Sequence, residues 1–181
     1  DGYSDLEGYG AFYFDKVDTQ VDGNLVRGHV RNPYKVITVH AVRQRLCMMI
    51  GQEVIVDSRD AVVLCETGLP DRFYVPESAI PIRYLAASDR VTVCTYKGEA
   101  RYFHLCVEER LMENVVWVYP EPWTDFTADV ARIKNCLGLY TTTFDTVLLD
   151  DVPVQTNSTE VATDRTMRTS PTVDRVLAEK N

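Results

Sequence analysis

The feature that most restricts the fold is a series of short apolar, β-branched segments that glycine and proline residues separate. Gly51-Gln52 stands between two of these segments and predicts a tight hairpin. Many short strands at close spacing predict a mainly β fold, which we expect to be a compact domain of several short, strongly curled antiparallel sheets. The segments that we predict to be strands are 36–42, 46–50, 53–58, 61–66, 72–76, 91–95, 101–108 and 115–119.

One short helix is predicted over residues 127–138. Thr127 can cap its first turn and Gly138 can end it. Three apolar residues between them recur at helical spacing, which predicts one buried face. These residues are Val130, Ile133 and Leu137.

Composition divides the chain into a single β-rich domain over residues 1–152 and a polar, flexible tail over residues 153–181. The tail is rich in Thr, Ser, Asp and Glu as far as Ser170, and it has few large apolar residues. Ser170-Pro171 can begin a short terminal helix, which is too short to be stable without a partner surface.

The N-terminal part of the chain is more apolar than a solvated leader. We expect residues 9–21 to be an ordered part of the domain, because five of them are large and apolar. A weak internal repeat is also present, since FYFDKVDT at 12–19 aligns without a gap with LYTTTFDT at 139–146. Three identities in this alignment fit either a duplication or chance. The apolar residues are Tyr9, Phe12, Tyr13, Phe14 and Val17.

The net charge of −8 argues against two classes of partner. Nucleic acids and anionic membrane surfaces both need a basic protein surface, so we expect neither as a partner. No segment approaches the roughly 18 apolar residues of a membrane span, and the N-terminus does not resemble a secretory signal. The five cysteines contain no C-x-x-C pair, which favours reduced, buried thiols in an intracellular, cytoplasmic protein.

Period-two alternation gives three of the predicted strands an aliphatic face and an opposite face of aromatic residues with polar tips. Two interpretations stay open for the second face. It is either a solvated or interfacial surface, or the wall of a pocket, because pockets combine aromatic side chains with a few polar groups. The candidate substrate-binding residues on this face are Tyr74, His104, Trp117 and Tyr119, with Tyr102 as a candidate catalytic residue.

Three charged residues are further candidates. Glu66 ends an apolar strand, where it either meets water or lies buried as a catalytic acid or base. Lys97 precedes Gly98, so it is either a turn residue or a cation at a pocket. Arg59 is either a surface residue or a fork that binds a carboxylate or phosphate.

Signatures of cofactor and metal sites are absent from the sequence. It contains no P-loop, no G-x-G-x-x-G and no serine elbow. Its three histidines lie far apart and lack the spacing of metal ligands. We therefore expect neither a cofactor nor a catalytic metal.

Three ordered motifs resemble the domain-of-unknown-function 427 family, which is also catalogued under a nucleotidyltransferase-like name. They are DSRDAVVLCETGLPDRFYVPESAI, CTYKGEARYF and WVYPEP, and RNPYK at 31–35 is similar too. The resemblance covers roughly residues 8–152. It implies a small β-rich domain whose pocket is lined by the motif residues. Some members carry two copies, and residues 8–25 look like the closing segment of a preceding copy. The chain departs from the family at Val93-Cys94-Thr95, where members commonly have His-Cys-Pro.

The leading functional hypothesis is a metal-free enzyme that acts on a small organic molecule. Glu66, Lys97 and tyrosines would supply acid–base or anion-stabilising chemistry for an isomerase, cyclase or lyase, with secondary metabolism as a biosynthetic setting. One alternative is a non-catalytic module that binds a small molecule or nucleotide. Another is the nucleotidyltransferase that the family name suggests. A third is an interaction protein whose aromatic face forms a homodimer interface.

Overall fold

The computed structural model describes residues 7–13, 16–21, 23–26 and 28–154. Nearly all of the predicted C-terminal tail, including its terminal helix, lies outside these residues. Within them, the chain is mainly β, as the sequence predicts. The strongly curled sheets that we expected are not supported, because no sheet is strongly curled.

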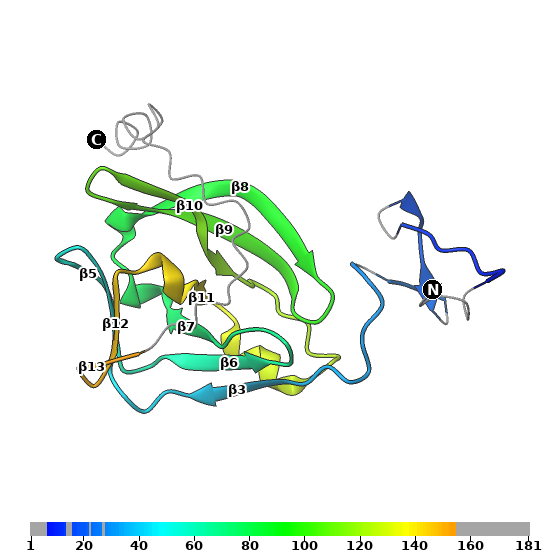
Figure 1. Cartoon of the computed structure of the whole chain (residues 1–181), viewed down its shortest axis with the longest axis horizontal. Helices are drawn as coiled ribbons and strands as arrows, with labels where there is room; N and C mark the ends of the chain where they lie inside the picture. The colour runs from blue at the N-terminus through cyan, green and yellow to red at the C-terminus, as the bar shows by residue number, and fades with distance from the viewer. Residues whose placement is uncertain (1–6, 14–15, 22, 27, 155–181) are drawn as a thin grey trace.

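Two antiparallel sheets form the body of the molecule, and a small hairpin precedes them (Figure 1). The seven-stranded sheet contains, in spatial order, β3 (Ile37–Ala41), β6 (Val62–Glu66), β7 (Arg72–Pro76), β11 (Cys136–Leu139), β10 (Arg110–Val118), β9 (Gly98–Val107) and β8 (Leu85–Cys94). The four-stranded sheet contains β13 (Val152–Pro153), β12 (Thr146–Leu149), β4 (Leu46–Ile50) and β5 (Glu53–Ser58). The small hairpin consists of β1 (Gln20–Val21) and β2 (Asn24–Leu25). Short 3₁₀ helices lie at η3 (Glu77–Ala79), η4 (Ile82–Tyr84), η5 (Ala128–Ile133) and η6 (Thr141–Thr143).

The main hydrophobic core lies between the two sheets. Leu46, Met48 and Ile55 of the four-stranded sheet are fully buried there, together with Val75 and Leu105 of the seven-stranded sheet. The hairpin predicted at Gly51 joins β4 to β5 and is confirmed, with Gly51 at a φ of +57°. Burial of these aliphatic side chains is the main force that holds the two sheets together.

The other face of the seven-stranded sheet carries a second, aromatic core. Tyr74, Trp117 and Tyr119 pack there with Val130 and Ile133 of η5. Their neighbours along the same strands, such as Val75, lie in the main core instead. The division of these strands into an aliphatic and an aromatic face, which alternation predicts, is therefore confirmed.

The predicted helix over residues 127–138 is only partly correct. Thr127 does cap a helix, but this helix is of the 3₁₀ type and ends at Ile133. Asn135 then adopts a positive φ of 58°, which turns the chain into β11. Leu137, which we expected on the helix, instead pairs with Val75 and with a residue of β10 in the middle of the sheet. Pairing on both sides outweighs the local helical pattern.

Strand β11 joins the two halves of the seven-stranded sheet. It pairs with β7 on one side and β10 on the other, although it comes late in the chain. Gly138 lies opposite Trp117 in this pairing, and the indole covers it. A Cβ atom at Gly138 would lie 2.4 Å from Trp117 Cε2, so a larger residue would displace the ring.

The N-terminal arm, which we define as the described part of residues 7–26, repeats the backbone pattern that closes the domain. Tyr13 O accepts a hydrogen bond of 3.0 Å from Lys16 N, and the hairpin of β1 and β2 follows. Tyr140 O likewise accepts a hydrogen bond of 3.0 Å from Thr143 N, and the hairpin of β12 and β13 follows. The weak repeat in the sequence thus has a counterpart in the local backbone.

The aromatic side chains of the arm are exposed. It lies to one side of the body, shown in blue in Figure 1. Tyr9, Phe12 and Tyr13 are each about four-fifths exposed. These three side chains are therefore not part of the hydrophobic core, and the expectation that residues 9–21 form an ordered part of the domain stays a prediction.

Replacing Gly138 with alanine should destabilise the fold, because the added Cβ would collide with the Trp117 indole in the centre of the sheet. We expect Gly138→Ala to lower the free energy of unfolding by about 1–3 kcal/mol in urea denaturation. Gly10→Ala is the matched control, since no atom lies within 4 Å of its Cβ position. An equal effect of the two substitutions would contradict this account of the junction.

Candidate functional site

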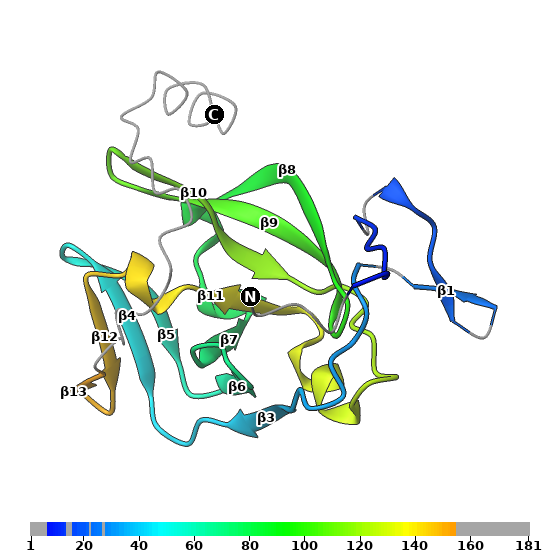
Figure 2. The same cartoon turned by 45° about the vertical axis from the view of Figure 1, so that its right-hand side comes forward.

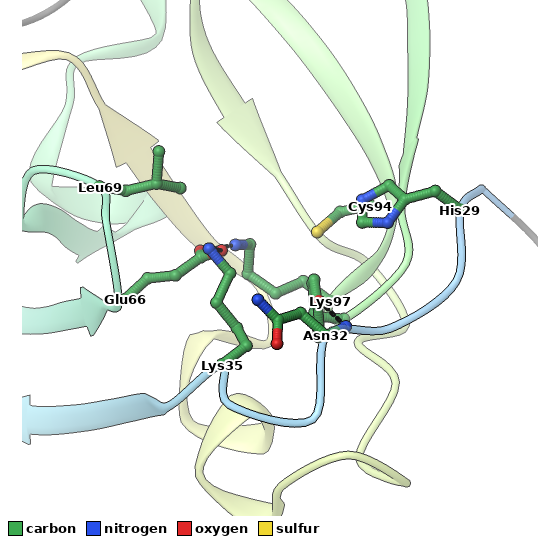
Figure 3. Close-up of a pocket in the computed structure, with 8 residues that line it drawn as sticks. His29, Asn32, Lys35, Glu66, Leu69, Cys94 and Lys97 are labelled. Atoms are coloured by element: carbon green, nitrogen blue, oxygen red, sulfur yellow. Dashed lines mark hydrogen bonds and ion pairs between the residues drawn. The ribbon is translucent and has the colours of Figure 1, made fainter. Parts of the chain in front are cut away.

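A cavity of about 430 Å³ lies where the turn between β8 and β9 meets the end of β6 and the segment before β3 (Figure 3). Its volume is in the range of pockets that hold small molecules. The lining residues are His29, Asn32, Lys35, Glu66, Leu69, Cys94, Tyr96 and Lys97.

The cavity contains a buried ion pair between two residues that the sequence predicts as catalytic. Glu66 is the last residue of β6, and Lys97 lies in the turn between β8 and β9. Lys97 Nζ donates a hydrogen bond to Glu66 Oε2. The two residues are only 8% and 7% exposed, so the pair is largely shielded from water. Figure 3 shows the two side chains meeting from opposite sides of the cavity.

A second lysine contacts the same carboxylate. Lys35 Nζ lies 3.1 Å from Glu66 Oε1 and donates a hydrogen bond of 2.7 Å to Thr67 O. It also lies 5.8 Å from the centre of the Tyr96 ring, a cation–π distance. Glu66 therefore bridges two ammonium groups, one on each of its oxygens.

The two lysines keep Glu66 ionised. Burial alone would raise the pKa of Glu66, but the charge and hydrogen bond of Lys97, and then those of Lys35, outweigh it. The net result is a pKa below the ordinary value of a glutamate. Glu66 is consequently a weak base, and its main effect is to hold and orient the two ammonium groups.

The turn that carries Lys97 is fixed on both sides. Lys97 N donates to Cys94 O at 3.3 Å, and Trp123 N donates to Lys97 O at 3.0 Å. Gly98 follows with a φ of +105°, which a residue with a Cβ rarely adopts. A Cβ there would also approach Trp123 and Glu121 O to 3.2 Å. This geometry explains the Lys-Gly dipeptide: the glycine makes the turn, and the lysine side chain enters the cavity.

Residues 28–36, which we call the strap, form one wall of the cavity. Figure 2 shows this segment passing the turn between β8 and β9 before it enters β3. Thr95 accepts a hydrogen bond of 2.9 Å from Arg31 Nε at its carbonyl, and its hydroxyl donates one of 2.7 Å to His29 O. Asn32 N donates to the Tyr96 hydroxyl at 2.6 Å. The strap is thereby fastened to the same turn that carries Lys97.

Three of the other candidates lie in the aromatic core rather than on the cavity wall. Trp117 Nε1 donates a hydrogen bond of 3.0 Å to the Tyr74 hydroxyl. Burial raises the pKa of Tyr74 and of Tyr119, so both phenols stay protonated. Tyr96 belongs to this aromatic core and also lines the cavity, so the two adjoin each other. The three aromatic residues support the site without lining it.

The remaining candidates are farther from the cavity. The Tyr102 hydroxyl lies 2.9 Å from Thr92 Oγ1. His104 Nδ1 accepts a hydrogen bond of 3.2 Å from Asn114 N, which satisfies an irregular part of β10. Arg59 is exposed in the connection between β5 and β6. None of these three side chains is among the residues that line the cavity.

Sequence reasoning missed most of the other lining residues. Lys35 belongs to RNPYK, a stretch noted only for its resemblance, and its charge gave no separate signal. His29 and Asn32 belong to the strap, which reaches the β8–β9 turn across more than 60 residues of chain. Cys94 and Tyr96 belong to the motif CTYKGEARYF, whose residues the resemblance implies as a pocket lining, but neither was named as a candidate site residue.

No group of three or more His, Cys, Asp or Glu side chains in the part of the chain that the structure describes could hold a metal ion. No helix within it has both the length and the apolar character needed to cross a membrane.

The model of a known protein family matches most of the β-rich domain. The model described as a domain of unknown function (DUF427), and labelled NTP_transf_9, matches residues 38–150. The chain belongs to the DUF427 family. No curated protein matches the chain. The DUF427 match begins after the strap, so three of the lining residues, His29, Asn32 and Lys35, precede it.

The lowered pKa of Glu66 predicts a specific pH dependence of stability. A glutamate whose folded pKa lies below its unfolded value of about 4.3 stabilises the fold above that pH. This contribution is lost as the pH falls through the folded pKa. Urea denaturation should therefore give the wild type a clearly larger free energy of unfolding than Glu66→Gln at pH 7. This difference should shrink as the pH falls below about 4.3.

Glu99→Gln provides the control for this experiment, because Glu99 is an exposed residue of β9. The free energy of unfolding of Glu99→Gln should stay close to that of the wild type at every pH. A Glu66→Gln difference that does not change with pH would mean that the carboxylate is not held ionised by the lysines.

Proposed function

We propose that the protein is a cofactor-independent enzyme that acts on a small organic molecule in the cavity beside Lys97. The observation that carries this proposal is the buried pair of Lys97 and Glu66 on the wall of a cavity of about 430 Å³. Replacing a buried ion pair with apolar residues is often neutral or stabilising. The pair is thus a poor device for stability, and a chemical role accounts better for its position.

Lys97 is the group that would carry the chemistry. Its ammonium group can donate a hydrogen bond or a proton to an oxygen that becomes negative during the reaction. Glu66 acts as a positioning residue, because it binds the ammonium group and stays ionised. Isomerisation, cyclisation and elimination next to a carbonyl all pass through such an oxyanion, and none requires a cofactor.

These reactions also need a group that accepts a proton from carbon. Glu66 is poorly suited to this task, because its pKa is lowered. Among the described side chains that line the cavity, Cys94, His29 and Tyr96 remain as groups of a type that accepts protons in enzymes. The Tyr96 hydroxyl already accepts a hydrogen bond from Asn32 N, which leaves Cys94 and His29 as the better candidates. We propose that one of them is the base, with the substrate between it and Lys97.

The setting of the protein is part of the same proposal. All five cysteines are free thiols, which fits a reducing compartment such as the cytoplasm. The aromatic side chains that might have formed a dimer interface are covered within the chain itself. A small organic substrate, from secondary metabolism or elsewhere, is therefore favoured over a protein partner at this face.

Substitution of Lys97 tests the catalytic role. The wild-type protein is incubated in D₂O with a panel of small carbonyl compounds, and NMR follows both deuterium incorporation and product formation. Lys97→Met keeps the chain length but removes the charge, so we expect at least a tenfold loss of rate, which corresponds to about 1.4 kcal/mol. Lys97→Arg keeps the charge and should retain part of the activity.

Lys134→Met is the matched control, because Lys134 pairs with Glu121 in an exposed position outside the cavity. It should keep full activity. Circular dichroism and thermal denaturation verify that each variant folds. Full activity of folded Lys97→Met would overturn the catalytic role. Binding without conversion of any compound would instead favour the non-catalytic binding module.

A further inference from the structure

We infer that the cavity binds its ligand through one negatively charged group, a carboxylate or a similar monoanion, which Lys35 of the strap and Lys97 hold together. This inference deepens the proposed function and rests on the same site. It names a substrate class, a small organic acid, and a residue that selects it, Lys35.

Counting charges on the cavity wall gives the first argument. Lys35 and Lys97 contribute two positive charges, and Glu66 contributes one negative charge. Among the described residues, no other carboxylate lines the cavity. Arg31, the other strap residue with a permanent positive charge, is already paired with Asp125 at 2.8 Å. One positive charge is therefore left without a counterion, and burying such a charge is costly unless an anion joins it.

The geometry of the two ammonium groups gives the second argument. Each oxygen of Glu66 contacts one lysine, so both Nζ atoms lie beside the same carboxylate. An ammonium group has three hydrogen-bond donors. Lys35 uses two of them, on Glu66 and Thr67. Lys97 uses one, on Glu66. Donors thus remain on both lysines for a second carboxylate.

The strap supplies the selectivity. Lys35 is more accessible than Lys97, with 18% of its side chain exposed against 9%. It is held in place because the strap is fastened to Thr95 and Tyr96. An anionic group that enters the cavity can therefore bind Lys35 first and then Lys97 as well. Lys97 uses one of its three donors on Glu66, so one donor is left for the reacting part of the molecule after it binds the anion.

The total charge of the protein favours a monoanion over a polyphosphate. The chain carries a net charge of −8, so its long-range field repels highly charged anions. The cavity offers a single uncompensated positive charge, and the sequence has no glycine-rich phosphate loop. A nucleoside triphosphate would bring several negative charges into this site. A small carboxylic acid matches it with one.

A matched ligand pair tests the inference. Thermal denaturation of the full chain at pH 7 is measured with a library of small organic carboxylates and with the primary amides of the same compounds. Magnesium ATP and inorganic phosphate are included as further probes. We expect some carboxylates to raise the melting temperature, whereas their amides, which have nearly the same shape and no charge, do not. Calorimetry then gives the dissociation constants of the best acids.

Variants locate the binding group. Lys35→Met should weaken binding of the best acid at least tenfold, and Lys35→Arg should restore most of it. Lys134→Met should bind like wild type, because this exposed lysine lies outside the cavity. The inference is wrong if no acid binds, if amides or ATP bind as well as acids, or if Lys35→Met binds the acid normally.

The two proposals fail in different ways. Acids that bind through Lys35 but are never converted would support the proposed ligand class and contradict the proposed enzymatic function. If a neutral compound is converted, and this conversion needs Lys97 but not Lys35, the enzymatic function is supported and the ligand class is contradicted.

Discussion

The seven-stranded sheet depends on β11, a strand of four residues that pairs with β7 on one side and β10 on the other. Glu66 belongs to the half of the sheet beyond β7, and Lys97 belongs to the half beyond β10. The close approach of these two residues therefore follows from the junction that β11 makes. Gly138 lets this junction form, because only a residue without a side chain leaves room for the Trp117 indole. The fold thus holds a costly ion pair at a fixed distance by means of apolar packing.

Period-two alternation predicted much of the fold correctly. It placed Val75 and Tyr74 on opposite faces of one strand, and the two residues lie in separate cores. Alternation works here because both faces of the sheet are covered, so that each side chain must suit its own layer. It failed where pairing outweighs local preference. Residues 85–90 lack β-branched side chains, yet β8 begins at Leu85, because Leu85 pairs with Leu105 of the long neighbouring strand.

The site could be predicted only in part. Glu66 and Lys97 stood out because each is a charged residue in a setting that makes it unusual, the end of an apolar strand and a turn before glycine. The aromatic residues were recognised as a group, but the two interpretations left open for them, a surface or a pocket wall, did not include a filled core. Alternation shows which residues share a face and not whether the face is filled. Lys35 needed knowledge of a contact between the strap and a turn far along the chain, and no local pattern encodes that contact.

The late position of β11 also has a consequence for the order in which the protein is made. All eight lining residues lie between His29 and Lys97, so they are synthesised before Cys136–Leu139. Until those four residues arrive, the two halves of the sheet have no strand to join them, and contacts of such long sequence separation form slowly. A nascent chain can therefore contain every group of the cavity without having the cavity. The cavity therefore forms only when the domain is almost complete, which keeps the two lysines and their carboxylate from meeting in an unfinished fold.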